Sequence, residues 1–392
     1  IIIMWEVQSM KKTKICKKFL CAAVSFSLMF CLPVYTQALA ADEITAPSAV
    51  LIEPQTGKVL FDKNCHEVRA CASITKIMTL LLVFEAIDAG KITMTDVVTA
   101  SAHAASMGGS DIWLEEGETM TVDEMIKATA VASANDAAVA LAEHVSGTED
   151  AFVEEMNKRA KELGMNETTF KNCNGLDEDG HVTSAYDVAL MSRQLTEHEE
   201  IFAYTSIWMD YLRDGATQIV NTNKLLKTYN GITGLKTGTT GQAGSCISAT
   251  ARRDKLSLIA VVLGAETGTD RFKDAATLLD YGFANFTTVT PSLTEELQTV
   301  TVKDGMQKQV ATAVDLSGSF LIKKGSEQSL ESKIEYVQEV QAPVEKGQKI
   351  GKITYMQDGE QLAVYDITAQ DNVEAVSFSA VLALLLKSFF LL

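Results

Sequence analysis

The 392-residue sequence predicts an α+β fold in which helices flank an antiparallel sheet, followed by a small all-β domain and a C-terminal amphipathic helix. Three patterns lead to this prediction. Apolar residues recur at helical spacing between residues 73 and 163, strand-like runs joined by tight turns occupy residues 234–263, and short alternating runs extend over residues 286–372. Strands joined by tight turns pair antiparallel, because a parallel neighbour needs a long crossover connection.

The predicted elements begin with a β-hairpin. Two apolar runs, at residues 49–52 and 59–61, flank a turn that contains Pro54 and Gly57. A helix follows from Ser73 and ends before Gly90. Its apolar positions are Ile77, Met78, Leu80, Leu81, Val83, Phe84 and Ile87. Because these residues leave almost no polar face, we expect this helix to be buried at the centre of the domain.

Further helices and strands complete this first domain. Polar loops separate three helical patterns at residues 122–132, 136–145 and 151–163. Three strands are predicted at residues 234–240, 246–251 and 256–263, and a helix at residues 271–283. We expect the first strands of the chain to lie beside the last of these, which gives helices packed on one antiparallel sheet.

The basic residues are unevenly distributed. The first 40 residues hold five Lys and one Glu, which leaves residues 41–392 with a net charge of −21. The basic stretch from Met10 precedes an apolar run at residues 19–32 and the sequence Ala38-Leu39-Ala40, a small-x-small cleavage pattern. We therefore expect a signal peptide over residues 1–40, with Met10 as its start. The alternative is a retained transmembrane anchor, for which the apolar run is short.

The composition excludes several classes of protein. With 47 % hydrophobic and 22 % charged residues, the chain is neither disordered nor collagen-like. Its net charge of −17 argues against a nucleic-acid partner, which would require clustered Lys and Arg. After the leader, the four remaining cysteines are too few for a disulfide scaffold, and neither they nor the five scattered histidines have the spacing of a metal site. These counts argue against a metal-dependent hydrolase, and we expect neither a metal nor a cofactor.

The C-terminal part has a different composition. Residues 286–372 are rich in Thr, Val, Gln and Lys, and turns at Asp304-Gly305 and Asp358-Gly359 separate alternating runs, which predicts a small all-β domain. Residues 373–392 are almost wholly apolar. Because an exposed apolar end is a liability in a soluble protein, we expect a membrane-associating interfacial helix. A buried core helix is the alternative.

Three short motifs occur in order, and the first is Ser73-Ile74-Thr75-Lys76. Residues three apart share a helix face, so Lys76 should lie beside the Ser73 hydroxyl. A lysine that is desolvated and crowded by another cation loses its proton near neutral pH, and Lys76 could thus activate Ser73 without a histidine. The alternative for Ser73 is an ordinary helix N-cap.

The second motif, Ser133-Ala134-Asn135, falls between two predicted helices. Loop side chains at such a position are free to enter a cleft. Ser133 could relay a proton between Lys76 and a leaving group, while Asn135 could hold a substrate amide or Lys76. A simple capping loop for the following helix is the alternative.

The third motif, Lys236-Thr237-Gly238, lies on a predicted strand. A cation and a hydroxyl at Lys236 and Thr237 are suited to a free carboxylate. Glycines such as Gly238 let a substrate backbone run alongside as an added strand. A glycine-rich turn without a ligand is the alternative.

With these motifs in place, the sequence resembles the penicillin-binding D-alanyl-D-alanine carboxypeptidases of bacteria. The segments that carry the resemblance are RACASITKIMT at 69–79, SANDAA at 133–138, Gly175-Leu176-Asp177 before His181, Ala185-Tyr186-Asp187, and GLKTGTT at 234–240. The resemblance implies a β-lactamase/transpeptidase-like fold, with a catalytic domain over residues 41–285, an all-β domain over 286–372 and a membrane-associating helix over 373–392.

The resemblance also implies roles for the matching residues. Ser73 corresponds to the acyl-enzyme nucleophile and Lys76 to its proton acceptor, and Ser133 corresponds to a serine that assists proton transfer. Lys236 corresponds to a lysine that binds the substrate carboxylate. We expect Asn135, Thr237 and Gly238 to complete the substrate-binding site.

The implied reaction is removal of the terminal D-Ala from peptidoglycan stem pentapeptides through an acyl-enzyme, with β-lactam antibiotics as inhibitors. The implied location is the outer face of the bacterial cytoplasmic membrane, reached by export and held peripherally by the C-terminal helix. Two alternatives share these motifs or this location: a β-lactamase that turns over the antibiotic, and a non-catalytic wall-binding scaffold.

Two cysteines depart from the family pattern. Cys71 and Cys173 stand where relatives often have proline. Because both segments would border the same cleft, a Cys71–Cys173 disulfide is one hypothesis, and two buried unpaired thiols are the alternative.

Overall fold

Helix α2 (Lys76–Asp88) is buried on nearly every side, as its apolar sequence predicts. It begins directly after a short 3₁₀ turn at Ala72–Thr75, which contains Ser73. The structure is a computed structural model that describes residues 39–293, 295–379, 381–382 and 385–386. Most of the predicted signal peptide therefore lies outside the described residues.

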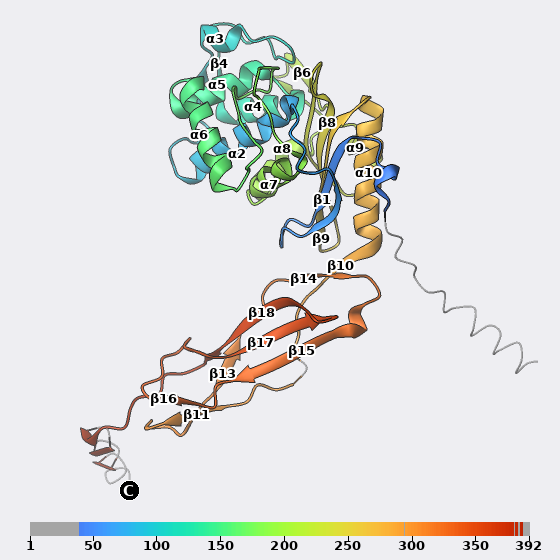
Figure 1. Ribbon diagram of the computed structural model, residues 1–392. Coiled ribbons are helices and arrows are strands. Elements are labelled where there is room, and N and C mark those ends of the chain that lie inside the picture. Colours follow the sequence, from blue (N-terminus) through green and yellow to red (C-terminus); the bar gives the residue numbers. More distant parts are fainter. Residues whose placement is uncertain (1–38, 294, 380, 383–384, 387–392) are drawn as a thin grey trace, which may run out of the picture. The chain divides into compact units, whose positions relative to one another are not determined.

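A five-stranded antiparallel sheet forms the framework of the first domain (Figure 1). Its strand order is β2-β1-β9-β8-β7. The strands are β1 (Ser48–Ile52), β2 (Val59–Lys63), β7 (Ile232–Thr240), β8 (Gly244–Arg253) and β9 (Leu256–Ala265). The predicted neighbourhood of the first and last strands is confirmed, since Ser48 pairs with Leu263 along β1 and β9. Strand β7 lies at one edge, where it pairs with β8.

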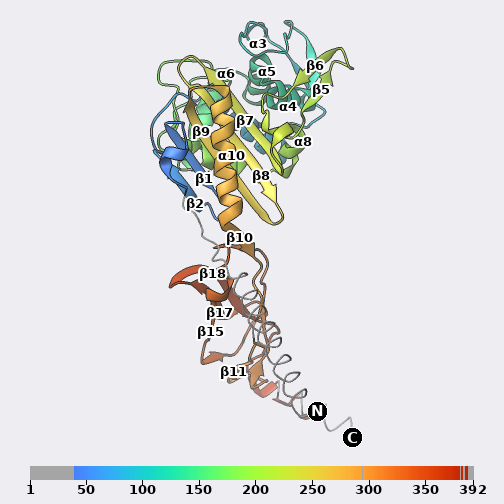
Figure 2. The same ribbon diagram turned by 90° about the vertical axis from the view of Figure 1, so that its right-hand side faces the viewer.

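Strand β9 separates two apolar cores. Its odd-numbered residues from 259 to 263 pack in the core that contains helix α2, and its even-numbered residues from 258 to 262 pack in the core that contains helix α10 (Gly268–Asn285). This alternation follows from the period of two residues along a strand. Figure 2 shows α10 lying across the sheet. The fold is thus a sheet covered by helices on both faces.

Three helices on the α2 side match predicted ones: α4 (Val122–Lys127), α5 (Asn135–Ser146) and α6 (Glu149–Glu162). A further helix on this side is α7 (Ala185–Leu195). The helix predicted over residues 122–132 is divided, because a π-helical turn at Ala128–Ala132 follows α4. Helix α7 was not predicted. Short elements that were also not predicted are α3 (Ala102–Ala105), α8 (Phe202–Thr205), α9 (Leu225–Thr228), a two-stranded sheet of β3 and β4 (Val97–Thr99, Thr119–Thr121) and the hairpin β5–β6 (Met209–Leu212, Thr217–Val220).

The C-terminal part is an all-β domain with its own apolar core, as predicted. Its strands are β10 (Phe286–Val289), β11 (Val300–Lys303), β12 (Gln309–Val310), β13 (Thr312–Val314), β14 (Phe320–Lys323), β15 (Leu330–Tyr336), β16 (Glu339–Gln341), β17 (Lys349–Gln357) and β18 (Glu360–Ala369). The predicted turn at Asp358-Gly359 joins β17 to β18, and both of its residues have positive φ. Two such residues match the twist of a two-residue hairpin.

The apolar tail is described only in part. Val373 makes a β-bridge with Val344 and is buried, so the beginning of the tail packs with the β domain. Farther on, the described residues 378–379, 381–382 and 385–386 have helical backbone, and Phe378 is exposed. The membrane-associating helix over 373–392 therefore stays a prediction. Within the described ranges, no helix combines the length and the hydropathy required to cross a bilayer.

Candidate active site

Lys76 lies directly beside the Ser73 hydroxyl. Its Nζ donates hydrogen bonds to Ser73 Oγ at 3.0 Å, to the carbonyl oxygen of Asn174 at 2.6 Å and to Asn135 Oδ1 at 2.5 Å. The lysine is fully buried, while Ser73 is partly exposed. The first motif thus places a buried amine against an accessible hydroxyl, as the sequence spacing predicts.

Burial changes the acid–base chemistry of Lys76. Desolvation lowers its pKa to about 7, although Cys173, Asp111 and Asp136 act in the opposite direction. A buried amine is easier to deprotonate because the charged form loses its hydration. A general base works best when its pKa is near the working pH, so Lys76 is suited to take the proton of Ser73 at neutral pH.

Ser133 and Lys236 form the second pair of the site. Ser133 ends the π-helical turn in a left-handed conformation, with φ of 63°. Lys236 Nζ, which reaches across from β7, donates to Ser133 Oγ at 2.8 Å and to the carbonyl of Thr237 at 3.0 Å. The pKa of Lys236 is lowered, mainly by burial and to a smaller extent by repulsion from Lys76 and Arg271. The second and third motifs, far apart in sequence, therefore meet in one hydrogen bond.

Asn135 connects Lys76 to the rim of the site. Its side chain accepts from Lys76 and donates through Nδ2 to the carbonyl of Gly108 at 2.7 Å. Its backbone N–H donates to the carbonyl of Ser110 at 2.7 Å. Asn135 therefore fixes the loop around residues 108–110 and at the same time orients the lysine.

Gly238 allows β7 to approach the 3₁₀ turn at Ala72–Thr75, which we call the serine-bearing turn. A Cβ at this position would lie 3.0 Å from Ala72 Cβ, from the Cys71 carbonyl oxygen and from the Ile74 nitrogen. The side chain of the neighbouring Thr237 is hydrogen-bonded to that of Thr222, with 2.5 Å between the two Oγ1 atoms. The absence of a side chain at Gly238 thus places Ser73 close to an edge strand.

Arg271 on α10 is a site residue that sequence reasoning missed. Its Nη1 donates to the Gly238 carbonyl at 2.8 Å and to Thr239 Oγ1 at 2.7 Å. This contact places a second cation beside the third motif. The helix at 271–283 was predicted, but nothing in its local pattern indicates that its first residue reaches across to β7.

Asn174 and Gly175 were also missed as parts of the site. Asn174 supplies a carbonyl to Lys76, and Gly175, with φ of +88°, packs against the serine-bearing turn. A Cβ on Gly175 would lie 2.0 Å from the Ala72 carbonyl oxygen. The quoted Gly175-Leu176-Asp177 segment was a sign of the family, but its contact with the turn is visible only in three dimensions.

His181 stabilises the serine-bearing turn through hydrogen bonds. Its Nδ1 accepts from the Lys171 N–H at 3.0 Å, so the proton of the neutral ring lies on Nε2, which donates to Thr75 Oγ1 at 2.7 Å. The Thr75 hydroxyl then donates to the Ala72 carbonyl at 2.9 Å. Ala72 has an unusual φ of 51°, and this chain of hydrogen bonds stabilises it. Burial lowers the pKa of His181 to about 4, so the ring stays neutral.

Comparison with known proteins decides the family. Residues 35–267 match the family model described as D-alanyl-D-alanine carboxypeptidase, of the S11 peptidases. The chain belongs to the D-alanyl-D-alanine carboxypeptidase family. Residues 286–375 match the C-terminal domain of penicillin-binding protein 5.

Similar proteins agree with this membership. D-alanyl-D-alanine carboxypeptidase DacF of Bacillus subtilis is 46 % identical over 85 % of this chain and 87 % of its own length. The crystal structure of penicillin-binding protein 5 from Haemophilus influenzae is 32 % identical and has a TM-score of 0.75, covering 86 % of this chain and 100 % of that chain. Penicillin-binding protein D2 of Listeria monocytogenes, solved in an ampicillin-bound form, is 34 % identical with a TM-score of 0.57 over 61 % of this chain and 98 % of that chain. These likenesses do not favour the β-lactamase or scaffold alternatives.

The disulfide hypothesis is wrong for this D-alanyl-D-alanine carboxypeptidase. Cys71 and Cys173 are both free and buried. The Cys71 sulfur contacts Thr75 Oγ1 at 3.3 Å. The Glu149 carboxylate accepts a hydrogen bond from the Cys173 backbone N–H at 2.9 Å and is also a hydrogen-bond partner of the Cys173 thiol. Each thiol therefore packs with partners of its own, and burial raises the pKa of Cys71 to about 12.

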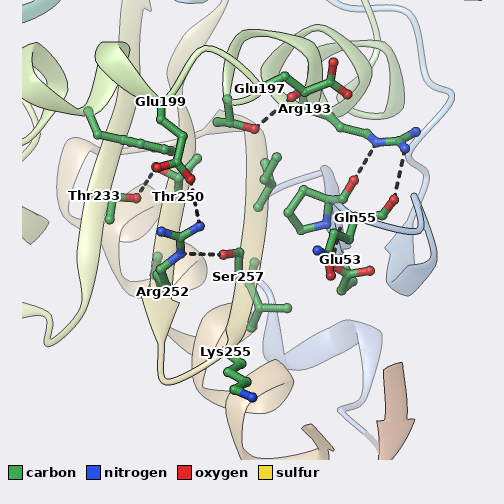
Figure 3. Close-up of a pocket in the computed structure, with 16 residues that line it drawn as sticks. Glu53, Gln55, Arg193, Glu197, Glu199, Thr233, Thr250, Arg252, Lys255 and Ser257 are labelled. Atoms are coloured by element: carbon green, nitrogen blue, oxygen red, sulfur yellow. Dashed lines mark hydrogen bonds and ion pairs between the residues drawn. The ribbon is translucent and has the colours of Figure 1, made fainter. Parts of the chain in front are cut away.

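A cavity of about 600 Å³ lies elsewhere in the first domain of this carboxypeptidase (Figure 3). None of the residues of the three motifs lines it. Its charged side chains already have partners: Arg252 pairs with Glu199 at 3.2 Å, and Arg193 donates to the Pro54 carbonyl. In the described part of the chain, no group of three or more His, Cys, Asp and Glu is placed to hold a metal ion.

Proposed function

We propose that Ser73 is the nucleophile with which this serine D-alanyl-D-alanine carboxypeptidase attacks the terminal D-Ala–D-Ala bond of a peptidoglycan stem pentapeptide. The observation that carries the proposal is the buried Lys76 amine 3.0 Å from Ser73 Oγ. As Oγ bonds to the carbonyl carbon, its proton passes to Lys76 Nζ. A pKa of about 7 leaves a large share of the amine neutral and able to accept it.

Ser133 carries the proton to the leaving group. When the tetrahedral intermediate collapses, the bond from carbon to nitrogen breaks and the departing D-Ala nitrogen needs a proton. The Ser133 hydroxyl, which accepts a hydrogen bond from Lys236 at 2.8 Å, donates that proton to the nitrogen. Ser133 then recovers a proton from Lys76, which had taken it from Ser73, so the Lys76 amine is neutral again. The remaining peptide stays on Ser73 as an ester, which water then hydrolyses.

Lys236 and Thr237 bind the terminal carboxylate of the substrate. The pKa of Lys236 is lowered by burial and by neighbouring cations, and an arriving carboxylate restores its charged form. Arg271 adds a second cation next to Gly238. The substrate backbone extends along the edge of β7, where the strand offers peptide groups, and Asn135 contributes its side-chain amide.

β-Lactam antibiotics are inhibitors because they acylate Ser73 and remain attached. Their strained amide places a carbonyl carbon where the D-Ala–D-Ala carbonyl would lie, and their carboxylate meets Lys236 and Thr237. The ampicillin-bound form of the Listeria relative supports this reading.

The chain acts outside the cytoplasm, on the cell wall. We propose a signal peptide over residues 1–40, a catalytic domain over 41–285, an all-β domain over 286–372 and an anchoring helix over 373–392 at the outer face of the cytoplasmic membrane. The basic leader and the apolar tail support this arrangement. Because the chain after residue 40 has a net charge of −21, anionic lipid would repel it, and the tail must hold by apolar burial.

The test is release of D-Ala from a pentapeptide that ends in D-Ala-D-Ala. The wild-type protein should release D-Ala and lose this activity with penicillin, and Ser73→Ala should not release it. A β-lactamase would instead hydrolyse penicillin with a penicilloyl-enzyme half-life far below a minute. A scaffold would neither release D-Ala nor become labelled.

A further inference from the structure

Trp113 is an exposed aromatic residue held in an unusual backbone conformation. Its side chain is 79 % exposed, the highest exposure of any large apolar residue in the described residues 39–285. Its φ of 55° lies in the left-handed region, which bulky residues rarely adopt. An exposed indole adds little to the core, so packing does not explain why the chain accepts this conformation.

Two charged side chains fix the backbone on both sides of Trp113. The Asp136 carboxylate accepts hydrogen bonds from the Ile112 N–H at 3.1 Å and the Leu114 N–H at 3.0 Å. The Arg213 guanidinium donates to the Ile112 carbonyl at 3.0 Å and to the Trp113 carbonyl at 3.5 Å. The indole therefore projects from a backbone that is already ordered, which reduces the entropy lost when a ligand binds.

Arg213 is itself anchored. It forms a bidentate ion pair with Glu118, in which Nε donates to Oε1 at 2.6 Å and Nη2 donates to Oε2 at 3.1 Å. Glu118 follows Trp113 on the same loop, whereas Arg213 follows strand β5. The ion pair thus ties the β5–β6 hairpin to the loop that carries the tryptophan.

The loop of Trp113 is continuous with the candidate active site. Ser110 accepts a hydrogen bond from the backbone of Asn135 at 2.7 Å, and Asn135 contacts Lys76. Trp113 is three positions after Ser110, so their Cα atoms are at most about 11 Å apart. An extended stem pentapeptide spans roughly 17 Å. Such a peptide is longer than the segment that leads from Ser110, which contacts Asn135, to Trp113.

We propose that Trp113 is a platform for a pyranose ring of the glycan to which the stem peptide is attached. This inference rests on the proposed function, because it assigns a site to another part of the same substrate. The apolar C–H face of the sugar stacks on the indole, and its hydroxyls remain in water. The adjoining Glu115 and Glu116 are exposed and would repel an anionic lipid surface, whereas a neutral sugar is compatible with them.

The experiment compares two substrates with the same pentapeptide, one free and one attached to its disaccharide. For the wild-type chain we expect kcat/KM for D-Ala release to be several-fold to about tenfold higher with the disaccharide. Trp113→Ala should reduce the ratio of the two values to about one, and Trp113→Phe should keep part of it. Arg213→Lys should lower the ratio while the indole remains, because the loop loses its two-pronged support.

Val97→Ala is the matched control. It removes another exposed apolar side chain, 62 % accessible on β3, and should leave the ratio unchanged. Equal kcat/KM values for the two substrates in the wild type, or an unchanged ratio in Trp113→Ala, would overturn the inference while leaving the proposed function intact. Failure of the wild type to release D-Ala from either substrate would instead overturn the proposed function, and this inference with it.

Discussion

The Lys76 amine lies 3.0 Å from the Ser73 hydroxyl, and its other two acceptors are neutral oxygens. A side-chain amide of Asn135 and a backbone carbonyl of Asn174 orient the amine without forming an ion pair. An adjacent carboxylate would keep the lysine charged, whereas neutral acceptors allow burial to lower its pKa. The same hydrogen bonds that aim the lysine therefore leave it able to act as a base.

The rate of acylation should depend on pH through Lys76. Because the pKa of this amine is lowered to about 7, the base form is scarce at pH 5.5 and predominates above pH 8. We expect the second-order rate constant for penicillin acylation to rise about tenfold per pH unit below pH 7 and to level off above it. Stopped-flow measurement with a fluorescent penicillin checks this; a rate that is flat or falling between pH 5.5 and 8.5 would contradict it.

Asp111→Asn is the electrostatic control for that profile. The Asp111 carboxylate raises the pKa of Lys76, so its removal should shift the rising limb to lower pH. Glu116→Gln changes an exposed carboxylate on the same loop and should leave the limb in place. Equal shifts in the two variants would mean that the limb does not report on Lys76.

Gly175→Ala should disrupt the serine-bearing turn. The added Cβ would lie 2.0 Å from the Ala72 carbonyl oxygen, and φ is +88°. We expect a loss of about 3 kcal/mol in the free energy of unfolding, measured by urea denaturation, together with slow acylation by penicillin. Gly164→Ala has a similar φ of +77° but no atom within 4 Å, so it should cost only about 1 kcal/mol. Equal losses would show that backbone conformation alone, and not the contact with Ala72, sets the effect.

His181 should make stability depend on pH. Its folded-state pKa is about 4, below the unfolded value of 6.5, so below pH 6.5 the unfolded chain binds a proton that the folded chain does not. Stability is therefore full above pH 6.5 and is lost as the pH falls toward 4, by on the order of 3 kcal/mol. In His181→Asn this part of the loss should be absent. Parallel curves of unfolding free energy for the two proteins between pH 7 and 4.5 would refute the assignment.

The thiols offer a check on the packing around the site. Cys71 and Cys173 are buried, and burial raises the pKa of both, to about 12 for Cys71. We expect neither to react with iodoacetamide in the folded protein, and both to be alkylated after denaturation without a reductant. Recovery of a disulfide-linked peptide pair from the exported, non-reduced protein would contradict the structure.

Local patterns predicted the candidate site because the three motifs occur together in a fixed order and at characteristic positions in the predicted elements. The spacing of Ser73 and Lys76 on one helix face predicted their contact, and the strand patterns at 234–263 predicted the sheet. The partners that complete the site come from distant segments. Asn174, His181 and Arg271 reach it only through tertiary packing. The Gly175-Leu176-Asp177 segment before His181 indicated the family, but it did not indicate these contacts.

Two other differences have specific causes. Helix α7 was missed although Ser184 caps it by accepting a hydrogen bond from the Asp187 N–H, a signal that the sequence displays. The disulfide hypothesis was wrong because bordering one cleft does not bring two sulfur atoms together. The roles of the motif residues, the signal peptide and the membrane-associating helix remain predictions.

The central claim is that Ser73 is the acylated nucleophile. The most direct measurement is mass spectrometry of the protein after incubation with penicillin, followed by mapping of the modified peptide. The account predicts one penicilloyl adduct on the peptide that contains Ser73 in the wild type, and no adduct in Ser73→Ala. An adduct that persists in Ser73→Ala, or that maps to another residue in the wild type, would contradict it.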